Sequence, residues 1–337
     1  MIFFKKFRFF LLLCFFMSSF SYAYFQKNEA GQEVFSFTSS FQSPRNAALE
    51  HSNGALPSTD PGVTLLNPAA LRHPENASNT VALHWQTGDF ADNQGMLSYT
   101  HAFGTMLLQA NYGWIAYGDI EGYDEQGNAT GVNHSPKSQL ASATLAFPLP
   151  HFQFGTTIKV ASDLLSGEVG DRTAMALAFD WGILWQPNTS RFGIGIAARD
   201  FGTMIRDYTD DGEDESYGMG ETVALSAFFH PGSLPRLALL FETTFPRYAQ
   251  PAMNLGAEYA LGTSFFARVG FTRTWLDLSR DVKEVFASDS RPDETNDARF
   301  LSTGLGYENS LFALDYAFSY LAQGLGMEHR VGLRFYF

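Results

Sequence analysis

Large apolar residues and small or polar residues alternate along most of the chain after residue 78. Successive side chains leave a β-strand on opposite faces, so a period of two predicts strands with one apolar face. The alternation is clearest in residues 173–185, where the large apolar positions are Met175, Leu177, Phe179, Trp181, Ile183 and Trp185. About fourteen segments share the pattern: residues 80–87, 94–103, 106–118, 137–148, 151–163, 173–185, 191–201, 220–229, 236–245, 252–261, 264–275, 298–307, 311–320 and 328–337.

The lengths and connections of these segments are typical of a barrel in a bacterial outer membrane. Most segments have about ten to thirteen residues, near the length that crosses a bilayer at a tilt. Even-numbered segments are followed by short turns such as Gly104-Thr105, and odd-numbered ones by longer links, including residues 119–136, 164–172, 202–219 and 276–297. Short turns at one end and long loops at the other are characteristic of such barrels. We therefore predict an all-β fold, a transmembrane antiparallel β-barrel of about 14 strands, with both termini on the periplasmic side.

The last two segments predict a hairpin that ends the chain on an aromatic residue. If the hairpin turns at Gln323-Gly324, Asp315 faces Gly332, and two arginines are its diagonal neighbours. The chain closes on Gly332, Phe335 and Phe337, a pattern that resembles the signal by which the barrel-assembly machinery recognises its substrates. The alternative interpretation is the edge strand of a soluble β-sandwich.

The amino terminus predicts export. Lys5, Lys6 and Arg8 precede the apolar residues 9–17 and a small-residue cleavage site at Ala23, so residues 1–23 form a secretory signal peptide. The apolar run is too short for a membrane-spanning helix. The single cysteine, Cys14, would leave with this peptide, which excludes disulfides, thiol catalysis and thiolate metal sites. The expected location is the cell outer membrane.

Residues 24–78 do not alternate and are rich in proline. Their apolar side chains need burial, which favours a plug or hatch packed into the barrel 79–337 over a mobile leader. These side chains are Val63, Leu65, Leu66 and Leu71, and they flank the plug motif Asn67-Pro68.

Composition and charge narrow the class of protein. Hydrophobic residues make up 45% of the chain, aromatic residues 15%, and 30 glycines are present. Because each strand of a barrel offers only half of its residues to lipid, such a mixture fits an outer-membrane barrel. Without the signal peptide the net charge is about −16, so nucleic acid is not an expected partner.

No pattern of catalytic, cofactor or metal-ligating residues is present, so we expect neither an enzyme nor a cofactor. The histidines lack metal-ligand spacing. One predicted extracellular loop is strongly acidic and could bind Ca²⁺, but its spacing departs from an EF-hand, which favours a solvated surface loop. Its carboxylates are Asp207, Asp210, Asp211, Glu213, Asp214 and Glu215.

The alternation also places charged residues on the inward face of the barrel. A charge removed from water needs a partner, so their mixed signs favour an internal ion-pair network over a charge-selective constriction. They are Lys159, Asp180, Arg199, Glu242, Glu258, Arg268, Asp315, Arg330 and Arg334.

Three patches resemble the PorV/PorQ family of outer-membrane proteins. The carboxyl-terminal patch comprises Asp315, Tyr316, Ala317, Leu325, Gly326, His329, Arg330 and Phe337. The others are the run Asn67-Pro68-Ala69-Ala70-Leu71 and the loop that contains Tyr117-Gly118 and Asp124-Glu125-x-Gly127. The chain departs from the family at Leu49-Glu50-His51-Ser52, where a glycine-rich run is usual.

This resemblance implies a fourteen-stranded barrel similar to the long-chain fatty acid transporter, with a plug, and a role in type IX protein secretion or the attachment of exported cargo. The implied partners are outer-membrane lipid, secretion-system proteins and cargo. The alternative function is a fatty-acid-transporter-like barrel that passes hydrophobic solutes, and a structural porin is a third. The inward positions are mostly small or charged, which favours the secretion role.

Overall fold

The computed structural model describes residues 33–88, 91–124, 126–165, 172–187, 191–208, 218–286, 301–320 and 326–337. The predicted signal peptide 1–23 and the first part of the predicted plug therefore lie outside the described residues, as do all the carboxylates of the acidic loop except Asp207.

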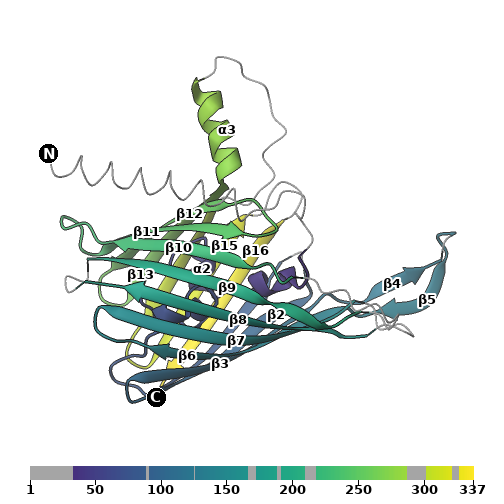
Figure 1. Ribbon diagram of the computed structural model, residues 1–337, viewed down its shortest axis with the longest axis horizontal. Coiled ribbons are helices and arrows are strands. Elements are labelled where there is room, and N and C mark those ends of the chain that lie inside the picture. The colour runs from purple at the N-terminus through teal and green to yellow at the C-terminus, as the bar shows by residue number, and fades with distance from the viewer. Residues whose placement is uncertain are drawn as a thin grey trace.

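Fourteen antiparallel strands close into a single barrel, which confirms the predicted fold (Figure 1). Neighbours in sequence are neighbours in the sheet, and β1 pairs with β16 from Thr80↔Tyr336 to Thr87↔His329. The strands are β1 (Asn79–Thr87), β2 (Asn93–Phe103), β3 (Met106–Ala116), β6 (Lys137–Phe147), β7 (Phe152–Leu164), β8 (Ala174–Trp185), β9 (Phe192–Arg206), β10 (Thr222–Phe229), β11 (Leu237–Pro246), β12 (Ala252–Leu261), β13 (Phe265–Thr274), β14 (Leu301–Glu308), β15 (Phe312–Tyr320) and β16 (Met327–Tyr336).

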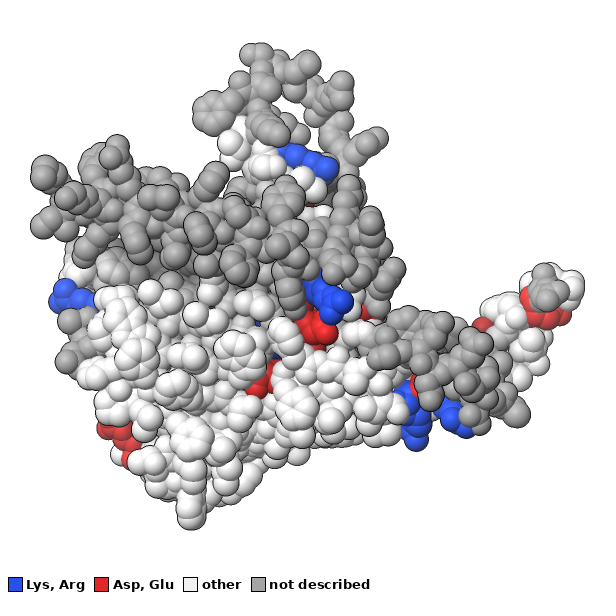
Figure 2. All heavy atoms as spheres, viewed as in Figure 1, with Lys and Arg blue, Asp and Glu red and all other residues white. Residues whose placement is uncertain are grey.

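The two faces of the wall follow the alternation read from the sequence. In β8, Phe179 and Trp181 are each 48% exposed on the outside, whereas Ala176 and Ala178 are fully buried inside. The wall that faces the viewer in Figure 2 is accordingly largely free of charged residues. The register is also as expected, since Asp315 pairs with Gly332. Alternating side chains thus give the barrel an apolar outer surface and a lumen lined by small and polar groups.

The longer links between strands contain structure that the alternation did not predict. Residues 119–136 include a hairpin of β4 (Ile120–Tyr123) and β5 (Ala129–His134), which extends away from the barrel (Figure 1). The link after β13 begins with helix α3 (Trp275–Phe286), which Arg273 joins to the strand end through an ion pair with Asp281. Among the described helices, none has the length and apolarity needed to cross a membrane.

Four short helical segments of the described part of the plug lie within the barrel: η2 (Ser36–Ser40), α2 (Pro44–Ala48), η3 (Pro61–Leu65) and η4 (Pro68–Ala70). The last three begin alike, because Ser43, Asp60 and Asn67 each cap a helix whose first residue is proline. A proline there loses no backbone hydrogen bond, and the preceding polar side chain satisfies a free N–H group. The described plug therefore consists of short turns, three of them capped by a side chain and the first, η2, without such a cap. Val63, Leu65, Leu66 and Leu71 are all buried in it.

Candidate functional site

The plug rests on glycines of the barrel wall, and the motif Asn67-Pro68 occupies one of these seats. A Cβ atom on Gly155 of β7 would lie 2.3 Å from the carbonyl carbon of Pro68. A Cβ atom on Gly182, its partner on β8, would lie 2.0 Å from the Asn67 side chain. Only glycine allows the plug to approach the wall this closely. The sequence predicted a plug motif, and the structure places it against β7 and β8.

A chain of alternating charges ties the plug to strands β12, β13, β15 and β16. Arg45 of α2 binds both carboxylate oxygens of Glu258, with Nε–Oε2 2.9 Å and Nη2–Oε1 2.8 Å. Glu258 also accepts a hydrogen bond from Arg268 at 2.7 Å, and Arg268 in turn pairs with Asp315. Asp315 pairs with Arg334 at 2.7 Å. We call this chain of Arg45, Glu258, Arg268, Asp315 and Arg334 the plug latch. Arg45 is its plug residue, and it is held by two parallel hydrogen bonds.

The plug contributes an anion to the same region through Asp60. Its carboxylate accepts a hydrogen bond from Ser43 and lies 3.6 Å from His84 of β1. Burial would raise the pKa of Asp60, but the charges of Arg334 and His84 outweigh burial and lower it. Burial would likewise lower the pKa of Arg45, but Glu258 raises it above its ordinary value. Both groups are therefore charged at neutral pH.

A second charged group lies on the opposite wall, at a bulge in β9. Lys159 of β7 pairs with Asp180 of β8 at 2.7 Å and with Asp200 of β9 at 2.8 Å. The strand register shifts here, and Asp200 has a φ of 59°, which is unusual for a residue other than glycine. The Asp200 N–H donates to Asp180 at 2.7 Å, and Arg199 turns inward to Glu242 at 3.1 Å. The ion pairs thus fix the bulge.

The structure buries all nine inward charges named from the sequence but divides them among separate groups. Arg330 pairs with Glu328 at 2.9 Å and donates to Gln86 of β1. Sequence reasoning missed Arg45, Asp60 and Asp200 because the first two belong to the plug and the third is at a bulge, where simple alternation fails. A capping residue before proline was the available signal for Asp60.

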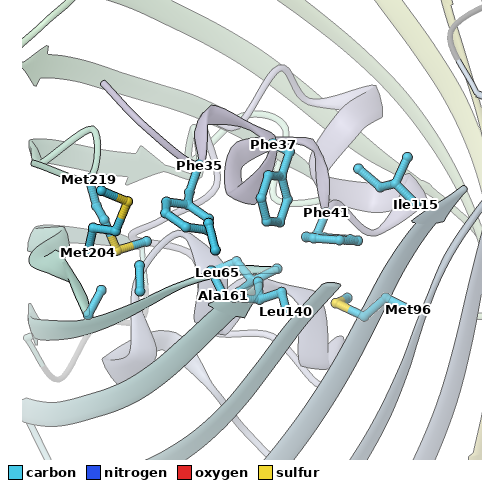
Figure 3. Packing of buried hydrophobic residues seen from close by; sticks show 13 residues of the cluster. Phe35, Phe37, Phe41, Leu65, Met96, Ile115, Leu140, Ala161, Met204 and Met219 are labelled. Atoms are coloured by element: carbon cyan, nitrogen blue, oxygen red, sulfur yellow. The ribbon is translucent and has the colours of Figure 1, made fainter. Parts of the chain in front are cut away.

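An apolar cluster, here called the phenylalanine cluster, fills the space between plug and wall near the longer links (Figure 3). The phenylalanines and Leu65 come from the plug, and the remaining side chains from the barrel strands and the link before β10. The members are Phe35, Phe37, Phe41, Leu65, Met96, Ile115, Leu140, Ala161, Ala174, Ala176, Ala178, Met204 and Met219. Sequence reasoning missed it because the plug phenylalanines follow no strand pattern.

The phenylalanine cluster is packed tightly. Phe37 contacts Phe35 and Phe41, with ring centroids 5.9 and 6.1 Å apart. Gly113 of β3 makes room for the Phe41 ring, since a Cβ atom there would lie 2.6 Å from it. A crevice beside Phe41 and Met96 has a volume of about 10 Å³, room for roughly one water molecule. A solute could pass here only after the plug side chains move.

The carboxyl-terminal residues named as an assembly signal lie at the seam of the barrel. Gly332 faces inward against His84 and Pro44, whereas Phe335 and Phe337 point outward and are 49% and 63% exposed. Phe337 exchanges two backbone hydrogen bonds with Asn79, at 2.8 and 3.0 Å.

In the part of the chain that the structure describes, no group of three or more His, Cys, Asp or Glu residues is arranged to hold a metal ion.

Comparisons with known proteins identify the fold through solved structures alone. No family model and no curated protein matches the chain. The toluene transporter TodX of Pseudomonas putida is 12% identical, with a TM-score of 0.53 over 84% of this chain and 95% of its own. Its deltaS2S3 mutant, described as a monoaromatic hydrocarbon channel, has 12% identity and a TM-score of 0.59 over 88% and 99%. A Pseudomonas aeruginosa FadL homologue is 13% identical, with a TM-score of 0.50 over 87% and 96%.

These likenesses establish a barrel of the FadL and TodX type. No family model confirms the resemblance to PorV/PorQ, and no finding supports the type IX secretion role. The findings fit the alternative expectation, a fatty-acid-transporter-like barrel, better than the secretion role.

Proposed function

We propose that this chain is an outer-membrane channel for small hydrophobic molecules and that the described state is closed by its plug. Solutes would enter at the end of the barrel that bears the longer links, displace plug side chains and leave past the plug. The outward face supports the membrane location, because a barrel with its large apolar side chains outside is stable only in lipid.

The observation that carries this proposal is the phenylalanine cluster. The lumen of a general porin is polar and filled with water. Here the corresponding part of the lumen buries three phenylalanines of the plug against Met96, Ile115 and Leu140 of the wall. Apolar side chains that meet across a movable boundary can exchange their contacts with one another for contacts with an apolar solute. The similarity to TodX, a toluene transporter whose deltaS2S3 mutant is a monoaromatic hydrocarbon channel, agrees with such a solute.

From the sequence alone, the small and charged residues at inward positions favoured a secretion role over transport. The charges are paired with one another in the plug latch and at the β9 bulge. The bulge borders the phenylalanine cluster, since Lys159 is the cross-strand neighbour of Ala178, but its charges are satisfied by their own ion pairs. No described feature specifically favours the secretion role.

The test is uptake of labelled toluene and labelled decanoate by cells that lack their own hydrophobic-solute channels and carry this protein. We expect faster initial uptake of at least one of the two than with an empty vector, and no increase for a hydrophilic sugar. A plug lock provides the mechanistic control. Gln94 of β2 donates a hydrogen bond to the backbone carbonyl of Ser40 at 3.0 Å, so cysteines at positions 40 and 94 are within reach of a short bifunctional thiol-reactive cross-linker.

Cross-linking the double variant Ser40→Cys/Gln94→Cys should abolish uptake, and each single variant treated with the same reagent should keep it. Uptake equal to the empty vector for both solutes, or an equal increase for the sugar, would refute the proposal. Full uptake through the cross-linked barrel would refute the role of the plug.

A further inference from the structure

Three hydroxyl groups converge on one carboxylate where the phenylalanine cluster meets the longer links. Tyr208, just after β9, donates to Oδ2 of Asp163 at 2.8 Å, and Ser138 of β6 donates to Oδ1 at 2.6 Å. The hydroxyl of Tyr117, just after β3, lies 3.2 Å from that of Ser138. Because Ser138 gives its proton to Asp163, Tyr117 is the donor in that contact. Every hydrogen bond in this group thus runs toward Asp163.

This hydroxyl–carboxylate group covers the phenylalanine cluster directly. The ring of Tyr208 stacks on Phe35 with centroids 6.2 Å apart and an interplanar angle of 23°, and Tyr117 packs against the same cluster. Burial first, and then the hydrogen bond to Asp163, raise the pKa of Tyr208, so its hydroxyl remains a donor at neutral pH. An aromatic ring with one polar hydrogen is therefore already accommodated here, in the form of Tyr208.

The links that follow β3, β7 and β9 in the sequence are rich in carboxylates. Residues 117–136, 165–173 and 207–221 contain four, two and seven carboxylates, and the only basic residue among them is Arg172. Such a field attracts cations, is indifferent to neutral solutes and repels anions before they arrive.

We propose that this entrance selects uncharged aromatic molecules that carry a hydrogen-bond donor, such as phenols, and disfavours aromatic or fatty carboxylates. The inference rests on the proposed function and names the solute class of the same lumen. The ring of the solute would take the stacking position of Tyr208 on Phe35, and its hydroxyl would donate to Asp163.

Two properties of Asp163 give the selection its direction. An ionised carboxylate has about four acceptor positions, and Ser138 and Tyr208 use two of them. A phenolic hydroxyl can fill a third position or replace that of Tyr208. A solute carboxylate has no proton to donate at neutral pH, and it would be placed beside a like charge in a partly apolar region, where repulsion is poorly screened.

The experiment compares three solutes of similar size: 4-ethylphenol, ethylbenzene and 4-ethylbenzoate. Initial uptake of each labelled compound is measured at pH 7 in the cells described above, for the wild type, Asp163→Asn and Tyr208→Phe. Asp119→Asn is the matched control, because Asp119 accepts a hydrogen bond from Ser135 at the same end of the barrel but does not contact the phenylalanine cluster. The amount of folded barrel in the outer membrane normalises each rate.

For the wild type we expect 4-ethylphenol to enter faster than ethylbenzene, and 4-ethylbenzoate to enter about tenfold more slowly than either. Asp163→Asn should reduce the 4-ethylphenol to ethylbenzene ratio by about tenfold, the order expected for losing a hydrogen bond to a charged acceptor, and should raise 4-ethylbenzoate entry. Tyr208→Phe keeps the ring and the Asp163 charge, so exclusion of 4-ethylbenzoate should persist. The control removes one carboxylate of the same links, so it should leave the 4-ethylphenol to ethylbenzene ratio unchanged and change 4-ethylbenzoate entry much less than Asp163→Asn does.

Failure of the inference and failure of the proposed function give different results. If ethylbenzene enters through the wild type but Asp163→Asn changes neither the 4-ethylphenol to ethylbenzene ratio nor the 4-ethylbenzoate to ethylbenzene ratio, the proposed selection is wrong. The proposed channel function is then unaffected. Preferred entry of 4-ethylbenzoate would also overturn the selection. If ethylbenzene and 4-ethylphenol enter no faster than with an empty vector, both ideas are overturned.

Discussion

Replacing Arg45 with methionine should release the plug while leaving the barrel intact. The arginine is the plug residue that binds both oxygens of Glu258, and its side chain is 12% exposed. Methionine keeps much of the length and the apolar contacts of the side chain but removes the charge and all hydrogen-bond donors. Lysine at the same position keeps the charge but offers a single point contact in place of a fork.

The size of the effect follows from what Glu258 retains. Removing one partner of a buried ion pair costs about 3–5 kcal/mol, because the other charge is left buried without compensation. Glu258 still accepts a hydrogen bond from Arg268 at 2.7 Å, which places Arg45→Met near the lower value. A loss of about 3 kcal/mol in the free energy of plug docking would raise the undocked population by roughly a hundredfold. Arg45→Lys should fall between the wild type and Arg45→Met.

The assay is native-state proteolysis of the purified barrel with thermolysin, with mass spectrometry to follow cleavage within residues 49–71. Val63 and Leu71 are fully buried in the docked plug, so cleavage beside them reports undocking. When the plug redocks faster than it is cut, the cleavage rate is proportional to the undocked population. Arg236→Met, a change at an exposed turn, is the control.

Equal cleavage rates in the wild type, Arg45→Lys and Arg45→Met would refute the latch. So would an Arg236→Met protein that is cut as fast as Arg45→Met, because the effect would then reflect loss of any arginine. A fast-cleaved Arg45→Met barrel should also pass hydrophobic solutes faster than the wild type.

Three further predictions concern the plug and the seam. Gly155→Ala places a Cβ atom 2.3 Å from the Pro68 carbonyl carbon, so the overpacking should weaken plug docking by about 1–3 kcal/mol in the same proteolysis assay; Gly232→Ala, in an exposed turn, should not, and equal rates would count against the seat. The lowered pKa of Asp60 means that its contribution to docking is complete above its unfolded pKa of about 4 and is lost as pH falls through the lower folded value. Asp60→Asn should therefore accelerate amide hydrogen exchange of the plug between pH 5 and 8, by a factor that shrinks toward one in strong acid; a defect that grows with acidity would contradict this sign. Deleting Phe337 removes both backbone hydrogen bonds to Asn79 and should lower the yield of heat-modifiable barrel in outer-membrane fractions several-fold, whereas a wild-type yield would rule out its role in assembly.

The sequence by itself determined the barrel. A period of two repeated through fourteen segments specifies which side chains face outward, and a shift of one residue would turn every apolar side chain inward. The pairing of Asp315 with Gly332 followed from this alternation and the position of the turn. The inward charges also followed, because the same alternation fixes their face.

The tertiary structure alone decided how those charges are divided and where the lumen is apolar. Glu258 is bound by Arg45 of the plug and Asp315 by Arg268 of β13, and each arginine approaches from an element far away in sequence. The bulge at Asp200 interrupts the alternation and places the Asp200 carboxylate 2.8 Å from Lys159. The phenylalanines of the plug carry no periodic signal, since a single short helical turn such as η2 is too short to show one. Periodicity determines which face of a strand each side chain occupies. It does not determine the contacts between plug and wall, because these join elements that come together only when the barrel closes.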